Sequence, residues 1–203
     1  MKIAILVEGD TEVAFKGKLH DFLKQHLEQR MPRLKFIVYD GRIPKAEKLR
    51  RVVENLLTGK QAYDAVIALT DVYTGTNDFK DADDAKAKMK QWVGNNPNFY
   101  PHTALHDFEA WLLPYWKTIQ TIAKHNRSAP GASPETVNHH KPPSDWIKEI
   151  FRLGKCRKDY NKPIDGAKIL KENDLMIAIQ ACPELKAFVN RIIFLCDETK
   201  VIS

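Results

Sequence analysis

The chain has 203 residues, of which 43% are hydrophobic and 29% charged, a balance typical of a globular protein with a buried core. No run of about 18 apolar residues occurs, which excludes a membrane span, and the short apolar N-terminus does not resemble a secretory signal. The three cysteines include no CxxC pair, which disfavours a disulfide framework or a structural zinc site. The net charge of +6 favours polyanionic partners. We expect a cytoplasmic, enzyme-sized domain.

The first 70 residues alternate between apolar strands and amphipathic helices. Residues 2–7 are almost continuously apolar, which is typical of a strand buried on both faces of a parallel sheet. A helix is predicted over residues 10–30, and a second strand over residues 34–39. A helix over residues 45–57 and a third apolar strand over residues 63–70 follow. Two successive β-α-β units indicate an open parallel sheet covered by helices.

Beyond the third strand the chain becomes mostly helical. A charged helix is predicted over residues 81–92, and a fourth strand over residues 99–105, where Pro101 favours a position at the margin of the sheet. A long aromatic-rich helix is predicted over residues 107–122, with a kink at Pro114.

The expected fold class is α/β, an open and mostly parallel sheet of about four strands flanked by helices, with a helical C-terminal extension. We divide the chain into an α/β domain over residues 1–125, a Pro-rich loop over residues 126–143, and a helical extension over residues 144–203 packed on the same domain. The helices predicted within the extension cover residues 145–153, 164–171, 175–181 and 183–195.

Acidic residues recur where the predicted strands end. Glu8 and Asp71 directly follow the first and third strands, whereas Glu12 and Glu109 lie in the first turns of the helices after the first and fourth strands. Because the carboxyl ends of parallel strands share one edge, these distant side chains are predicted to meet. Clustered carboxylates repel one another unless they share protons or a cation, and oxygen ligands suit Mg²⁺ or Mn²⁺. Turn formation and helix capping explain each acid taken singly.

Ordered motifs spread over most of the chain carry a resemblance to a known family. The segment Val-Glu-Gly-Asp-Thr-Glu at residues 7–12 resembles the opening motif of TOPRIM domains, particularly those of OLD-like nucleases. The later motifs are similar to a bacterial TOPRIM-like family, the domain of unknown function DUF4276. They comprise residues 69–73, 77–79, 106–113, 160–162 (Tyr-Asn-Lys) and 182–183 (Cys-Pro).

The resemblance implies a TOPRIM-like fold and a Mg²⁺-dependent domain that cleaves phosphodiester bonds or otherwise processes nucleic acid, beside an ATPase partner in a bacterial antiviral defence system. We expect DNA as the substrate more than RNA, although the sequence itself does not distinguish them. It assigns Glu8 as a metal ligand or general base, Glu12 as an additional acid, and Asp71 as the first Asp of an Asp-x-Asp motif. Tyr73 replaces the second Asp, which puts a two-metal site in doubt unless Asp78 compensates. The expected catalytic residues are Glu8, Glu12 and Asp71, and the expected metal ligands are Glu8, Asp71, Asp78 and Glu109.

Histidine and basic residues supply further candidates. His106 is a candidate acid, base or phosphate contact. Residues 152–171 contain seven basic and two acidic residues, and residues 42–60 contain six basic and two acidic residues. Both stretches fit either phosphate binding or solvated helix faces. Nucleic-acid contacts are predicted at Lys141, Arg157, Lys158 and Lys162.

Three functional hypotheses stay open at this point. The first is a nuclease that uses Mg²⁺ or Mn²⁺. The second is a non-catalytic TOPRIM-like adaptor that docks an ATPase, which the substitution at Tyr73 favours. The third is a small-molecule phosphotransferase or nucleotide hydrolase that uses the same acids.

Overall fold

A four-stranded, all-parallel sheet forms the centre of the protein in the computed structural model, which describes residues 1–72, 78–131, 133–136, 141–154 and 159–202. The strand order is β2-β1-β3-β4, and adjacent strands pair in parallel throughout. The predicted α/β class with an open parallel sheet is therefore confirmed. The strands are β1 (Lys2–Val7), β2 (Arg33–Val38), β3 (Ala65–Val72) and β4 (Phe99–Leu105).

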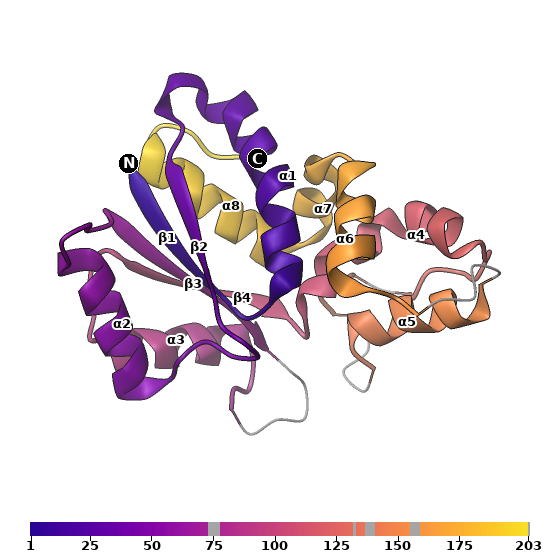
Figure 1. Cartoon of the computed structure of the whole chain (residues 1–203), viewed down its shortest axis with the longest axis horizontal. Helices are drawn as coiled ribbons and strands as arrows, with labels where there is room; N and C mark the ends of the chain where they lie inside the picture. The colour runs from indigo at the N-terminus through magenta and orange to yellow at the C-terminus, as the bar shows by residue number, and fades with distance from the viewer. Residues whose placement is uncertain (73–77, 132, 137–140, 155–158, 203) are drawn as a thin grey trace.

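Helices cover both faces of the sheet (Figure 1). Alternate residues of β1 point to opposite faces, so Ile3 and Ile5 join one core cluster and Ala4 and Leu6 join the other. The first cluster includes residues of α1 (Asp10–Leu27) and α8 (Pro183–Cys196), and the second those of α2 (Ala46–Thr58) and α3 (Ala82–Val93). Burial on both faces explains why β1 and β3 are apolar almost throughout.

The C-terminal helices share the core of the sheet. Trp111, which is fully buried, packs its ring against Phe15 of α1 and Phe188 of α8, with ring centroids 5.9 and 6.0 Å apart. The helix α6 packs against α1, and α8 packs against β4. The division of the chain into three parts stays a prediction. The remaining helical elements are η1 (Glu28–Arg30), η2 (Phe108–Tyr115), α4 (Trp116–Ala123), α5 (Pro143–Leu153), α6 (Lys162–Lys171) and α7 (Leu175–Ala181).

Two elements differ from the sequence prediction where they approach the strand ends. Instead of one long kinked helix, the chain forms the 3-10 helix η2 and then α4, because Pro114 has no N–H to donate within an α-helix and its ring crowds the preceding turn. In addition, β3 extends to Val72, so that Asp71 pairs with Ala104 inside the sheet instead of following the strand.

The strand β2 forms an open edge of the sheet. Its exposed side chains include Arg33, Lys35 and Val38, and charged residues on an edge strand oppose pairing with another chain.

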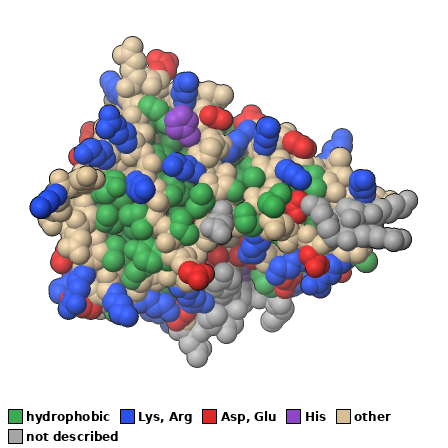
Figure 2. Space-filling view, in the orientation of Figure 1, with side chains coloured by type: hydrophobic (Ala, Val, Ile, Leu, Met, Phe, Trp, Pro, Cys, Tyr) green, Lys and Arg blue, Asp and Glu red, His purple; other side chains and the backbone are tan. Residues whose placement is uncertain are grey.

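The surface that faces the viewer in Figure 1 carries hydrophobic side chains with Lys and Arg around them (Figure 2). In the described part of the chain, no helix has both the length and the apolarity needed to cross a bilayer.

Gly154, which ends α5, lies against the C-terminus of α4. A Cβ atom there would overlap the carbonyl oxygen of Ala123 and come within 3.1 Å of the carbonyl oxygen of Ile150. We expect Gly154→Ala to lower the free energy of unfolding by about 1–3 kcal/mol. Gly17 of α1 has open space around it, so Gly17→Ala is expected to raise the same quantity by about 0.5–1 kcal/mol. Urea unfolding of both variants measures this contrast, and equal stabilities would contradict it.

Candidate functional site

A cavity of about 290 Å³ lies at the carboxyl ends of the central strands. Its walls come from the turn after β1, the start of α1, the loop after β2, the end of β3, η2 and the start of α6. Four acids that the sequence predicted to meet are brought together here. The lining consists of Glu8, Gly9, Thr11, Glu12, Gly41, Asp71, Phe108, Glu109, Lys162 and Pro163.

Glu8, directly after β1, is buried with a relative exposure of 5%. Its Oε1 accepts a hydrogen bond from the hydroxyl of Thr70, whereas its buried Oε2 has no hydrogen-bond partner among the described residues. Burial raises the pKa of Glu8, while the hydrogen bond from Thr70, the backbone of Ile43 and the positive charge of Arg42 oppose the rise. The carboxylate is thus held in place through one of its two oxygens.

Glu12 and Asp71 face this carboxylate from α1 and β3. Burial raises the pKa of Glu12 to about 7, and the negative charges of Glu109 and Glu8 contribute to the rise. Burial also raises the pKa of Asp71 well above its ordinary value, assisted by the charges of Glu12 and Glu8. These repulsions show that the acids act on one another electrostatically across the cavity.

Glu109 lies on η2 and is wholly buried. Its Oε2 accepts a hydrogen bond of 3.0 Å from Nζ of Lys162, and its Oε1 has no hydrogen-bond partner among the described residues. Burial and the charge of Asp107 raise the pKa of Glu109 to about 7, although Lys162 opposes the rise. The ring of Phe108, which packs on Phe15 at 5.5 Å between centroids, fixes η2 against α1.

Lys162 is the first residue of α6, and the predicted nucleic-acid contact lies inside the cavity. The side chain of Asn161 caps the helix by accepting a hydrogen bond of 3.0 Å from the amide of Ile164. This cap fixes the start of α6 and therefore the position of Lys162. Burial lowers the pKa of Lys162, but the negative charges of Glu109 and Asp107 outweigh burial, so its pKa is raised. Lys162 is therefore a cation at neutral pH.

The donor set of the cavity fits a hard divalent cation. All the acids offer oxygen, and Glu8 and Glu109, which both line the cavity, each have one buried oxygen without a hydrogen-bond partner among the described residues. Within the described ranges, no three His, Cys, Asp or Glu side chains are already assembled as a complete metal-binding group. Mg²⁺ typically takes one or two carboxylates and completes its shell with water and substrate oxygens, so Glu8 and Asp71 could hold it in this way.

The other predicted site residues lie elsewhere or outside the described residues. Asp78 pairs with Arg42 and Lys45. His106, buried at a φ of +71°, donates its backbone N–H to the carbonyl oxygen of Val72. Neither Asp78 nor His106 lines the cavity. The remaining three are Lys141, which pairs with Glu149 and lies over the ring of Trp146, and Arg157 and Lys158, which fall outside the described residues.

Asp107 is a buried acid near the site, though not in the cavity lining, that the sequence reasoning missed. It is 1% exposed, its Oδ2 accepts a hydrogen bond of 3.2 Å from the amide of Ser144 at the start of α5, and burial raises its pKa. Its charge also raises the pKa of Asp71 and Glu109. Asp107 follows β4 closely, so the criterion applied to the first and third strands would have found it.

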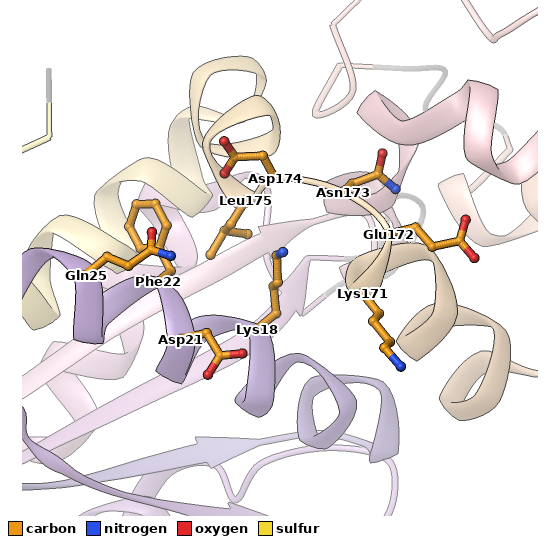
Figure 3. Close-up of a pocket in the computed structure, with 9 residues that line it drawn as sticks. All are labelled: Lys18, Asp21, Phe22, Gln25, Lys171, Glu172, Asn173, Asp174 and Leu175. Atoms are coloured by element: carbon orange, nitrogen blue, oxygen red, sulfur yellow. The ribbon is translucent and has the colours of Figure 1, made fainter.

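A second cavity, of about 370 Å³, lies between α1 and the turn from α6 to α7 (Figure 3). Its lining includes Lys18 and Asp21 of α1 together with Lys171 and Glu172, so both signs of charge are present. The buried polar atoms without partners in the described residues include none from its lining. The acidic cavity is therefore the stronger candidate for a functional site.

Metal affinity at the acidic cavity is expected to rise with pH. Glu12 and Glu109, each with a pKa of about 7, are largely protonated at pH 6 and must lose protons to bind a cation. Between pH 6 and pH 8, each displaced proton contributes about tenfold to the affinity for Mn²⁺, which isothermal titration calorimetry measures. Flat or falling affinity would contradict this expectation.

The same two groups predict the pH dependence of stability without metal. Because the folded-state pKa is raised, their stabilising contribution is fully present below pH 4.5, the ordinary pKa of Glu, and is lost as pH rises through about 7. Without divalent ions, Tm is therefore expected to fall between pH 5 and pH 8, and Mn²⁺ is expected to raise Tm more at pH 8. Glu12→Gln serves as the control, because it should flatten both trends.

The chain is similar to one protein family in sequence and to several solved structures in fold. The sequence profile of a family described as "Domain of unknown function (DUF4276)" matches residues 7–193. The structure is similar to the C-terminal region of the Burkholderia pseudomallei OLD protein, with 13% identity, 98% of each chain covered and a TM-score of 0.50. The C-terminal region of the Xanthomonas campestris pv. campestris OLD protein also matches, with 15% identity, 97% of this chain and 96% of that chain covered, and a TM-score of 0.40. No curated protein matches the chain. At such identities the structural likeness shows a shared fold alone.

Proposed function

Because the chain belongs to the DUF4276 family and shares the fold of an OLD C-terminal region, as its motifs predicted, we propose that it is a divalent-metal-dependent nuclease that acts on DNA. One observation carries the proposal. Glu8, Glu12, Asp71 and Glu109 reach a single cavity from four different elements, although they are spread over about half of the chain. In this proposal Glu8 and Asp71 hold Mg²⁺ or Mn²⁺, assisted by Glu109.

A cation held there supplies polarisation of a phosphoryl oxygen and a lowered pKa for a bound water. Glu12, with a pKa of about 7, accepts the proton of the attacking water near neutral pH. Lys162 directs its ammonium group into the cavity and stabilises the negative charge that develops on the phosphate. Glu109 orients that ammonium group through its hydrogen bond of 3.0 Å.

The proposed nuclease is expected to act with a protein partner. The OLD structure that shares this fold is the C-terminal region of a longer protein, so a separate partner could supply what the rest of that protein supplies. We propose an ATPase as this partner, with the pair acting in the cytoplasm in antiviral defence. Co-purification of the chain with a candidate ATPase from the same organism tests the pairing.

The decisive assay incubates the purified chain with single- and double-stranded DNA and RNA in Mg²⁺, Mn²⁺ or EDTA, with and without the ATPase. The proposal expects DNA cleavage with either ion and none in EDTA. If no substrate is cleaved under any of these conditions, the nuclease proposal fails.

A non-catalytic adaptor is the second candidate. It is favoured by the pairing of Lys162 with Glu109 and by the lack, in the part of the chain that the structure describes, of a complete metal-binding group. The adaptor hypothesis predicts that the chain binds the ATPase without binding Mn²⁺. Calorimetry with Mn²⁺ alone separates the two candidates.

A further inference from the structure

The loop from β2 to α2 carries two cations, Arg42 and Lys45, close to a residue that lines the acidic cavity. Gly41 lines the cavity, and its N–H donates to the carbonyl oxygen of Glu8 at 3.2 Å. Its φ of +101° is a conformation that side-chain-bearing residues rarely adopt, so a glycine suits this turn. Two residues further on, Ile43 is buried with a relative exposure of 5%. The loop is thus anchored on both sides of Arg42.

Arg42 and Lys45 act electrostatically on the cavity. The charge of Arg42 lowers the pKa of Glu8 against the effect of burial. Burial and Arg42 lower the pKa of Lys45, while Glu8 opposes that change. The side chains of Arg42 and Lys45 are 35% and 41% exposed, and Arg42 directly follows Gly41, which lines the cavity.

Asp78 joins these cations from a different loop. Its Oδ2 pairs with Nη1 of Arg42, and its Oδ1 lies 2.7 Å from Nζ of Lys45. The carbonyl oxygen of Asp78 also accepts a hydrogen bond of 3.0 Å from Nζ of Lys88. Two oxygens of one anion, each held by a separate cation, is an arrangement that also suits a phosphate group.

A nuclease with this cavity needs cations outside the acid cluster. Buried carboxylates repel a polyanion, so the DNA backbone must be attracted by positive charge nearby. Of the predicted nucleic-acid contacts that the structure describes, Lys162 is paired with Glu109, and Lys141 shares Glu149 with Arg127 away from the cavity. Arg42 and Lys45 share the carboxylate of Asp78, so these three residues together carry one more positive than negative charge, and they lie next to Gly41 of the cavity.

We propose that Arg42 and Lys45 form the subsite for a DNA backbone phosphate next to the cleavage position, and that Asp78 occupies this subsite as a counter-ion in the free protein. This inference rests on the proposed function and names the residues that bind its substrate. Phosphate binding displaces the carboxylate of Asp78 from the two cations. Asp78 is then a competitor of the substrate and not a metal ligand.

Binding without cleavage tests the subsite. Fluorescence anisotropy with a labelled 12-nucleotide single-stranded DNA in EDTA measures affinity at several salt concentrations. We expect Arg42→Gln and Lys45→Gln each to weaken binding about fivefold. Each should also make the slope of log affinity against log salt concentration less steep, by the amount that corresponds to the loss of about one phosphate contact. Asp78→Asn is expected to tighten binding about threefold, because one competing charge is lost.

Arg51→Gln is the matched control. Arg51 lies on the exposed side of α2, is 73% exposed and pairs with Glu47, so the substitution removes the same charge away from the cavity. We expect its affinity and salt slope to match those of the wild type. Thermal unfolding verifies that all four variants are folded.

Three results would overturn the subsite. Wild-type protein that does not bind the DNA at low salt, Arg42→Gln and Lys45→Gln that bind like Arg51→Gln, or Asp78→Asn that loses Mn²⁺ binding in calorimetry would each do so. Failure of the nuclease proposal is distinguishable, because it would leave this binding pattern intact while no cleavage occurs with Mg²⁺ or Mn²⁺.

Discussion

Glu8→Gln and Asp71→Asn are each expected to reduce Mg²⁺-dependent DNA cleavage by about a thousandfold or more. Both substitutions keep the shape of the side chain and remove the negative charge proposed to hold the cation. Burial raises the pKa of both acids, so a neutral side chain at either position should not unfold the protein. Initial rates of cleavage with saturating Mg²⁺ measure the effect, and calorimetry with Mn²⁺ should show weakened binding.

Glu47→Gln is the control for this comparison. Glu47 lies on the exposed side of α2 with its carboxylate paired to Arg50 and Arg51, so its loss also changes the net charge by one unit. Its cleavage rate should match that of the wild type. Undiminished cleavage by folded Glu8→Gln or Asp71→Asn would refute the assignment of the cavity as the catalytic site.

Lys162→Met is expected to reduce the maximal cleavage rate by about a hundredfold. The substitution keeps much of the length of the side chain and removes the ammonium group that donates to Glu109. Without this cation the pKa of Glu109 should rise above its value of about 7, so residual activity should shift to higher pH. A pH–rate profile between pH 6 and pH 9 measures both effects.

The kinetic pattern separates two roles for Lys162. A residue that stabilises charge at the reacting phosphate lowers kcat, whereas a residue that only holds the DNA raises KM and reduces the salt dependence of binding. We expect a loss in kcat, with partial recovery in Lys162→Arg because that variant keeps the positive charge. A change confined to KM, with an unchanged pH profile, would assign Lys162 to DNA binding alone.

The periodicity of the sequence predicted most of the fold. Alternating apolar strands and amphipathic helices indicated a parallel sheet, and the match of the family profile and the OLD fold confirmed the resemblance drawn from short motifs. The convergence of Glu8 and Asp71 follows from the same pattern, because adjacent parallel strands end at the same edge. The assignment of these acids to a metal stays a prediction.

The sequence pattern predicted less accurately the segments whose structure depends on backbone hydrogen bonding or on packing between elements. Pro114 was predicted to kink one helix, but the segment instead forms η2 and α4 as separate elements. Asp107 was placed at the start of a predicted helix, but its burial depends on the packing of α5 against η2, which the sequence pattern does not show.

By itself, then, the sequence determined the parallel sheet and the edge at which its acids gather, since side-chain periodicity and strand direction are local properties. Only the tertiary structure decided that Lys162 enters the cavity and that Asp78 pairs with Arg42 and Lys45. Those pairings join residues 33 to 53 positions apart in the chain, and they depend on how α6 packs against α1 and how the loop after β2 turns back on β1. Charge attraction acts through space, so no spacing along the chain encodes it.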